Sequence, residues 1–191
     1  MNNTEKFNKA IEFSLKWEGG RNFNIVNGKP VIKGNAKADA GGATAYGVTW
    51  ATLKSAYTNG VIFHNDICRL TLEEAKLIYK RNYWDKYSWG ELEYPVALCC
   101  LDCCINHGKF ATILQRAAND CGQNVVVDGL FGPKTFAALK ACPPMTLAKN
   151  IYIQRKKYYE KIVANKPSQK VFLKGWLNRA DAMAREAGVL A

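Results

Sequence analysis

The segment NTEKFNKAIEFSLKWEGG, residues 3–20, has the residue spacing of a helix with one buried face, followed by a glycine pair. Its core-compatible residues recur at the i, i+3, i+4 and i+7 spacing of a helix with one buried face, namely Phe7, Ala10, Ile11, Ser14 and Leu15. We predict a first helix over residues 3–17, which the glycine pair at 19–20 terminates. Glu18 follows Leu15 by three positions, so its side chain is expected on the core-facing side of the last turn.

Helices are also predicted along most of the remaining chain. A capping box at 71–74 starts one that runs towards residue 83 or 84. Prolines at first-turn positions and glycines after last turns mark others. The further predicted ranges are about 50–60, 95–108, 109–121, 133–141, 145–165 and 168–187. The predicted fold class is therefore mainly α.

Residues 21–49 depart from this helical pattern. They are rich in glycine and asparagine and show no 3.6-residue period. Within them, residues 23–26 and 30–33 flank Asn27-Gly28, which is the strongest short signal for a β-hairpin. We therefore expect a small β-hairpin and loop region directly after the first helix, and irregular backbone between rigid helices is a frequent place for function.

Charge and hydropathy limit the classes of partner. The net charge is +11, and eleven basic residues against the single acid Glu160 lie between residues 134 and 179. This strip must attract polyanions, which include nucleic acids, anionic cell-wall polymers and anionic membrane surfaces. No nucleic-acid-binding motif is present, so no specific nucleic-acid partner is predicted. No apolar run approaches the ~20 residues of a membrane span, and residues 1–16 do not read as a signal peptide.

Seven cysteines, four of them at positions 99, 100, 103 and 104, do not form the pattern of a secreted disulfide framework. At helical spacing Cys100, Cys103, Cys104 and His107 share a face, which could in principle bind a metal. Structural zinc sites usually draw their ligands from separated segments, and free cysteine packs well between helices. We favour packing and predict no metal.

Glu18 is the candidate for acid chemistry. Partial burial, the neighbouring Trp17 and the negative end of the helix dipole are each expected to disfavour its ionised form. A carboxyl group that stays protonated near neutral pH can protonate the departing oxygen of a glycosidic bond. The alternative is a surface glutamate that only ends the helix.

The segment DAGGATAYGVT at 39–49 supplies groups that could complete such a site. Asp39 could place or activate a water molecule, the Thr44 hydroxyl could hold that water, and glycines such as Gly42 let the backbone approach a sugar chain. The alternative for Asp39 and Thr44 is a side-chain turn that only stabilises the loop.

These segments resemble the N-terminal signature of glycoside hydrolase family 108, whose members are N-acetylmuramidases that include phage endolysins and proteins called secretion activators. The resemblance covers nearly the whole chain in order, through EGG at 18–20, DAGGATAYGVT at 39–49, YKRNYWD at 79–85, NHG at 106–108 and GWLNR at 175–179. The segment VDGLFGPKT at 127–135, preceded by LQR at 114–116, resembles a peptidoglycan-binding motif. Two departures are Ala40, where the family usually has proline, and a longer interval between Glu18 and Asp39.

The resemblance implies a lysozyme-like helical fold and hydrolysis of the β-1,4 bond between N-acetylmuramic acid and N-acetylglucosamine. It implies Glu18 as the catalytic acid, and peptidoglycan glycan strands as the partner. We divide the chain into a lysozyme-like catalytic region, 1–93, and a helical peptidoglycan-binding-like region, 94–191, packed as one unit. The motif at 128–135 has a second interpretation, in which it serves the folding of the C-terminal helices.

Four further side chains have predicted roles. Tyr46 and Trp84 are candidates for stacking on sugar rings. Asn106 could bind an N-acetyl group or could cap its helix. Arg179 is expected to pair with a buried carboxylate rather than to act in catalysis.

Rival functions remain open at this point. A lytic transglycosylase shares the single glutamate and the substrate but closes the sugar on itself and does not need Asp39. A non-catalytic wall-binding accessory of secretion or phage lysis would not need Glu18 as an acid, and nucleic-acid binding rests on charge alone. We expect no cofactor, a monomer, and synthesis in the cytoplasm, with a holin or a secretion apparatus providing access to the wall.

Overall fold

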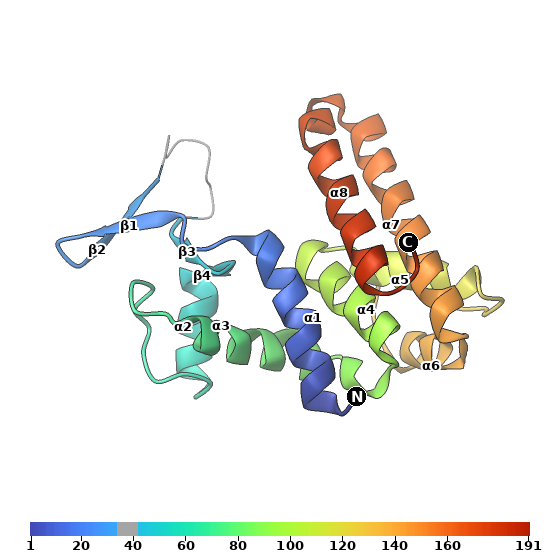
Figure 1. Ribbon diagram of the computed structural model, residues 1–191, viewed down its shortest axis with the longest axis horizontal. Coiled ribbons are helices and arrows are strands. Elements are labelled where there is room, and N and C mark those ends of the chain that lie inside the picture. The colour runs from blue at the N-terminus through green and yellow to red at the C-terminus, as the bar shows by residue number, and fades with distance from the viewer. Residues whose placement is uncertain (34–41) are drawn as a thin grey trace. The chain divides into compact units, whose positions relative to one another are not determined.

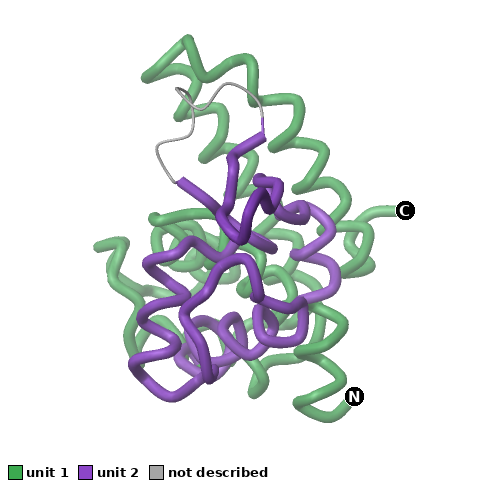
Figure 2. Tube along the Cα trace, turned by 90° about the vertical axis from the view of Figure 1, so that its left-hand side faces the viewer, with its two compact units in different colours: residues 1–10, 88–191 green, residues 11–87 purple. Residues whose placement is uncertain are grey.

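The computed structural model describes residues 1–33 and 42–191. These form eight α-helices and two short antiparallel hairpins, so the predicted mainly α fold with a small hairpin region after the first helix is confirmed (Figure 1). The chain divides into two compact units, one of Met1–Ala10 with Ser88–Ala191 and one of Ile11–Tyr87 (Figure 2). Helix α1, Asn3–Glu18, contributes its first half to one unit and its second half to the other.

The smaller unit contains two hairpins with turns of the same kind. Strands β1 (Phe23–Val26) and β2 (Lys29–Ile32) pair around Asn27-Gly28, as the sequence predicts. Strands β3 (Thr44–Ala45) and β4 (Val48–Thr49) form a second hairpin, which the sequence did not predict. In both hairpins the two turn residues have positive φ, which is the requirement of a type I′ turn.

Two helices complete the smaller unit. Helix α2 (Trp50–Thr58) begins at Thr49, whose hydroxyl caps the N–H of Thr52. Helix α3 (Leu72–Tyr79) begins with the predicted capping box, in which Thr71 and Glu74 satisfy each other's backbone N–H groups. It continues as a π-helical segment, Lys80–Asp85, so the helical range reaches the predicted end but changes its hydrogen-bond pattern.

The larger unit is a helical bundle. Its longer helices pack around α4, with α7 contacting α4, α5 and α8 (Figure 1). The elements are a short 3₁₀ turn, Trp89–Glu91, and helices α4 (Tyr94–Asn106), α5 (Phe110–Asn119), α6 (Pro133–Ala141), α7 (Pro144–Asn165) and α8 (Lys170–Glu186). The predicted range 133–141 is the observed one, and the other predicted helices differ from these by one or two residues at their ends, where terminal turns fray.

Helix α4 is buried along almost its whole length. Nine consecutive residues, 96–104, are buried, and they include the four clustered cysteines. Burial raises the pKa of the Cys103 thiol to about 11, so this side chain stays a neutral thiol. Among the described residues, no group of three or more His, Cys, Asp or Glu side chains is placed to hold a metal ion.

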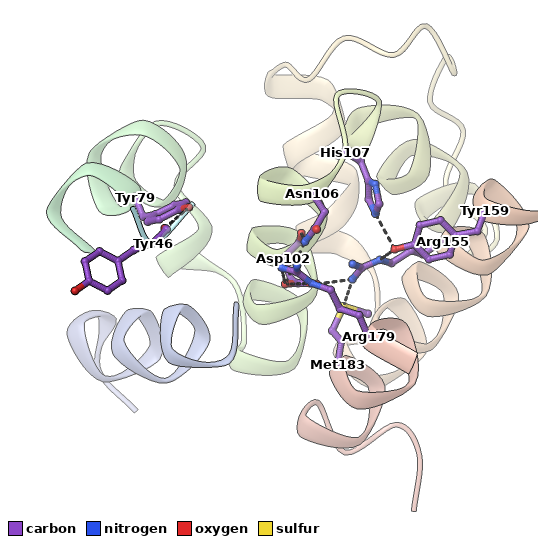
Figure 3. A network of polar contacts seen from close by, with 9 residues as sticks. All are labelled: Tyr46, Tyr79, Asp102, Asn106, His107, Arg155, Tyr159, Arg179 and Met183. Carbon is purple, nitrogen blue, oxygen red and sulfur yellow. Dashed lines mark hydrogen bonds and ion pairs between the residues drawn. The ribbon is translucent and has the colours of Figure 1, made fainter. Parts of the chain in front are cut away.

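The carboxylate of Asp102 is the charged group at the centre of this bundle. It accepts hydrogen bonds from Arg155 Nη1 on α7 at 2.6 Å and from Arg179 Nη2 on α8 at 2.7 Å (Figure 3). The two guanidinium groups outweigh the cost of burial and lower the pKa of Asp102 to about 2. The prediction that Arg179 pairs with a buried carboxylate is confirmed.

The network extends from Arg155 to the end of α4. Arg155 Nε donates to the hydroxyl of Tyr159 at 2.7 Å, and that hydroxyl lies 3.1 Å from Nε2 of His107. Burial, together with the positive charge of Arg155, lowers the pKa of His107 to about 3. His107 is therefore a neutral, structural imidazole at physiological pH.

We expect the His107 pKa to make the fold sensitive to acid. The unfolded chain binds this proton near pH 6.5 and the folded chain only near pH 3, so the free energy of unfolding falls as pH falls between these values. Between pH 6.5 and 4 the loss should be ~3 kcal/mol, from ~1.4 kcal/mol per pKa unit. Urea titrations over this pH range should show a flatter profile for His107→Gln, which cannot titrate. An equal slope in both proteins would contradict this assignment.

Candidate functional site

Glu18 is the last residue of α1, and its side chain is half-buried. The helix ends there because Gly19 adopts a left-handed conformation, with φ of +73°. The preceding Trp17 is 40% exposed, so its indole lies at the surface beside the glutamate in the chain. The end of α1 thus holds a partly accessible carboxyl group.

The turn between β3 and β4 is fixed on two sides. Tyr46 donates its N–H to the carbonyl of Gly20 at 3.1 Å, directly after α1. The hydroxyl of Tyr79, on α3, donates to the carbonyl of Tyr46 at 3.0 Å (Figure 3). Both polar backbone atoms of Tyr46 are therefore bound, which holds the turn between the end of α1 and α3 although Tyr46 has φ of +53°.

Gly47 brings this turn against Glu18. A Cβ atom at Gly47 would lie 3.2 Å from both Cβ and Oε2 of Glu18, and it would overlap the hydroxyl of Tyr79. The carboxylate therefore packs on the backbone of the turn in a space that only glycine leaves open. Gly47 also has φ of +76°, which independently favours glycine.

Asn22 holds the glycine-rich loop where the described residues resume. Its side-chain oxygen accepts the N–H of Thr44 at 2.7 Å, and its amide donates to the carbonyl of Gly42 at 3.0 Å. Its own N–H donates to the carbonyl of Thr44 at 3.1 Å. Asn22, which the sequence did not indicate, therefore clamps this loop at Gly42 and Thr44, whereas the loop-stabilising alternative for Asp39 falls outside the described residues.

The structure places the other predicted site residues in different surroundings. Asp39 lies outside the described residues. Thr44 is half-buried in β3, and the ring of Tyr46 points away from Tyr79 (Figure 3). Trp84 is only 1% exposed and offers no ring face to a sugar. The amide of Asn106 donates to the carbonyl of Asp102 at 2.8 Å within its own helix, which is the capping role of the alternative interpretation.

Two aromatic side chains near these elements were not predicted for the site. Tyr79 touches the turn through its hydroxyl, although its ring is buried in α3. Trp50 begins α2 directly after β4 and is 50% exposed. The signal for Tyr79 was its place in the segment at 79–85, and the signal for Trp50 was its adjacency to Thr49 at the end of the loop.

The larger unit contains a pocket of 1040 Å³ beside α6. Its wall includes residues of the loop before α6, among them Val126 and Leu130, which are 78% and 73% exposed. The buried Gln115 on α5 holds this loop in place, because its amide donates to Asp128 Oδ1 at 2.7 Å and to the carbonyl of Leu130 at 3.0 Å. Asp128 therefore has a folding role, and the accessible groups of the motif are mainly apolar.

The packing of Gly47 on Glu18 and Tyr79 predicts a specific cost for Gly47→Ala. We expect a loss of ~2–3 kcal/mol in the free energy of unfolding, from left-handed strain plus displacement of the turn. Gly28→Ala is the matched control, since Gly28 has φ of +73° in the other hairpin with nothing within 4 Å of a Cβ atom. Urea unfolding should show for this control only the ~1–2 kcal/mol of left-handed strain, which is less than the loss at Gly47. Equal losses would mean that strain alone, and not contact, constrains Gly47.

Comparison with known proteins finds two family matches and a similar solved structure. Residues 11–108 match the family model described as Glycosyl hydrolase 108, and residues 110–181 match the one described as Predicted Peptidoglycan domain. Among solved structures, SagA of Brucella abortus is similar, with a TM-score of 0.69 and 27% identity over 98% of this chain and 96% of that chain. No curated protein matches the sequence. Because the first match spans more than half of the chain and includes Glu18, the turn and α4, this chain belongs to the glycosyl hydrolase 108 family.

Proposed function

We propose that this protein is an N-acetylmuramidase, which hydrolyses the β-1,4 bond between N-acetylmuramic acid and N-acetylglucosamine in peptidoglycan. The two matched families together indicate a peptidoglycan hydrolase. The observation that carries the finer proposal is the position of Glu18. Its half-buried carboxyl group ends α1 and rests on the backbone of Gly47, within the segment that matches the hydrolase family.

In this mechanism Glu18 acts as the general acid. It donates its proton to the glycosidic oxygen while the bond to the anomeric carbon breaks, so that the departing sugar leaves as an alcohol. The turn supports this step because the backbone of Tyr46 is hydrogen-bonded to Gly20 and to the hydroxyl of Tyr79, and Gly47 packs on Glu18. A rigid wall on one side of the carboxyl group limits the directions from which a sugar can approach it.

A second group must stabilise the oxocarbenium-like transition state or place and activate the attacking water. We propose Asp39 for this role, with the Thr44 hydroxyl holding the water. The support for Asp39 is its place in the segment at 39–49. Asn22 fixes the described part of this segment at Gly42 and Thr44, and Gly47 of the same segment packs on Glu18. Gly42, with φ of +69° and an open side, leaves room for a sugar beside the loop.

Substrate binding is proposed for exposed aromatic rings and for the pocket. Tyr46 is half-buried on the turn, whereas the burial of Trp84 removes it from the proposed set. The exposed Trp17 and Trp50 replace it as candidates for stacking on sugar faces. We further propose that the pocket beside α6 holds an element of peptidoglycan, since it lies in the segment that matches the peptidoglycan domain.

Access to the wall remains part of the proposal. Among the described helices, none combines the length and the apolar character that crossing a membrane requires. A holin or a secretion apparatus is the proposed route, and the target of the matched C-terminal domain is peptidoglycan.

Glu18→Gln should reduce the release of soluble fragments from purified peptidoglycan by at least ~100-fold, because a general acid typically contributes ~10²–10⁴-fold. Mass spectrometry should find reducing N-acetylmuramic acid ends among the wild-type products. Glu12→Gln, an exposed glutamate of the same helix, is the matched control and should keep wild-type activity.

Other outcomes of this digestion would replace the proposal. Anhydro ends in the wild-type products would make the protein a lytic transglycosylase. Release by neither protein, with wall binding retained, would favour a non-catalytic wall-binding accessory. Full activity of Glu18→Gln would exclude Glu18 as the acid.

Asp39→Asn tests the second carboxylate in the same assay. A hydrolase that uses Asp39 to place or activate water should lose at least ~100-fold in rate, whereas binding to insoluble peptidoglycan should be unchanged. Asp66→Asn, a change of the same chemistry in the smaller unit outside this loop, serves as the control. Retained activity of Asp39→Asn would remove Asp39 from the mechanism, and with anhydro ends it would support the transglycosylase.

A further inference from the structure

The far part of the α7–α8 hairpin has no core of its own. Helices α7 and α8 run side by side and are joined by the 3₁₀ turn Pro167–Gln169 (Figure 1). The structure describes residues 160–178 throughout, and none of them is buried. The buried residues that flank this stretch, Tyr159 and Arg179, belong to the Asp102 network. We call residues 160–178 the hairpin tip.

The hairpin tip is strongly basic. It carries four exposed lysines and one acid, Glu160, and the lysines are Lys161, Lys166, Lys170 and Lys174. Among the described residues, none of these four lysines has an ion-pair partner. Their charge is therefore available to an external anion, which gives a structural location to part of the basic strip seen in the sequence.

Large apolar side chains are exposed among these lysines. Val171 is 78% exposed and Phe172 is 53% exposed, and both follow Lys170 at the start of α8. Val171 and Phe172 are consecutive in the chain, and exposed apolar side chains that lie together within a charged rim are typical of an interaction surface. Soluble polyanions would use the lysines but not these two side chains.

The ring of Phe172 is held in place. It stacks on Trp176 with ring centroids 5.9 Å apart, and Trp176 stacks on Tyr159 at 5.4 Å. Tyr159 in turn is fixed by Arg155 in the buried network. This column of rings leads from the core of the larger unit to the surface, so Phe172 is presented without the entropic cost of ordering a mobile side chain.

We propose that the hairpin tip is a docking surface for an anionic phospholipid bilayer. Phe172 and Val171 would enter the boundary between headgroups and acyl chains, and the four lysines would contact lipid phosphates. A bilayer surface is the partner that fits because it offers negative charge and an apolar layer within a few ångströms of each other. The hairpin tip and Glu18 with its turn belong to different compact units and share no residue, and vesicle binding is measured without peptidoglycan, so the proposal does not depend on the proposed hydrolase activity.

Sedimentation of the full chain with vesicles tests the proposal. Binding to vesicles of phosphatidylcholine with phosphatidylglycerol should be at least tenfold tighter than binding to phosphatidylcholine alone, and it should weaken with salt. Phe172→Ser should weaken binding to the anionic vesicles about tenfold, whereas Phe172→Leu should retain it. Leu77→Ser is the matched control, because Leu77 is 51% exposed on α3.

A charge-reversal pair separates local from overall charge. Lys166→Glu with Lys170→Glu should abolish vesicle binding, whereas Lys29→Glu with Lys54→Glu, both exposed lysines of the smaller unit, should reduce it only slightly. All variants should release fragments from purified peptidoglycan like the wild type, which keeps this test apart from that of Glu18. Equal weakening by the two lysine pairs, unchanged binding of Phe172→Ser, or binding to soluble polyphosphate but not to vesicles would each overturn the proposal.

Discussion

The buried carboxylate of Asp102 is the constraint on which the larger unit depends. It is the shared partner of Arg155 and Arg179, so one residue of α4 sets the positions of α7 and α8. Removing one member of a buried ion pair leaves an uncompensated charge and typically costs ~3–5 kcal/mol. The same arginines lower the pKa of Asp102 to about 2, so the carboxylate remains charged at every physiological pH. The hairpin tip is anchored to the bundle through this cluster, because the buried residues that flank it, Tyr159 and Arg179, belong to the network.

This cluster also explains why the two matched families do not correspond to the two compact units. The hydrolase match ends at residue 108 and the peptidoglycan match begins at residue 110. Asp102 lies in the first match, whereas Arg155 and Arg179 lie in the second. A chain cut between them would bury two guanidinium groups without a counter-ion, which is costly. The boundary between compact units lies instead between residues 87 and 88, before α4, in agreement with the packing of α4 among α5, α7 and α8.

Most of the fold could be predicted from local patterns, and what could not be predicted depends on contacts between distant residues. A few neighbouring residues are enough to determine each of these patterns, namely helical periodicity, the capping box at Thr71 and the Asn27-Gly28 turn. The β3–β4 hairpin has two-residue strands and tyrosine at a position that usually takes asparagine or glycine, so it has no comparable signal. Its turn is held by hydrogen bonds with Gly20 and with Tyr79, which lies 33 residues from Tyr46 in the sequence. The candidate acid Glu18 could be named from its helix and its family resemblance, whereas the parts played by Asn22 and Gly47 required the three-dimensional structure.

The two type I′ turns of the smaller unit give a reason to place function at Glu18 that does not depend on family membership. The β1–β2 turn uses Asn27 and Gly28, the residues that adopt these conformations with least strain, and its glycine faces open space. The β3–β4 turn places the bulky Tyr46 at φ of +53°, which costs ~1–2 kcal/mol. Two hydrogen bonds to the backbone of Tyr46, one with the carbonyl of Gly20 and one from the hydroxyl of Tyr79, offset this strain, and the result is a backbone surface against the Glu18 carboxyl group. The β1–β2 turn shows that the same turn type can form in this unit without such strain. Backbone strain that is kept in place by surrounding contacts, as in the β3–β4 turn, is typical of a functional site.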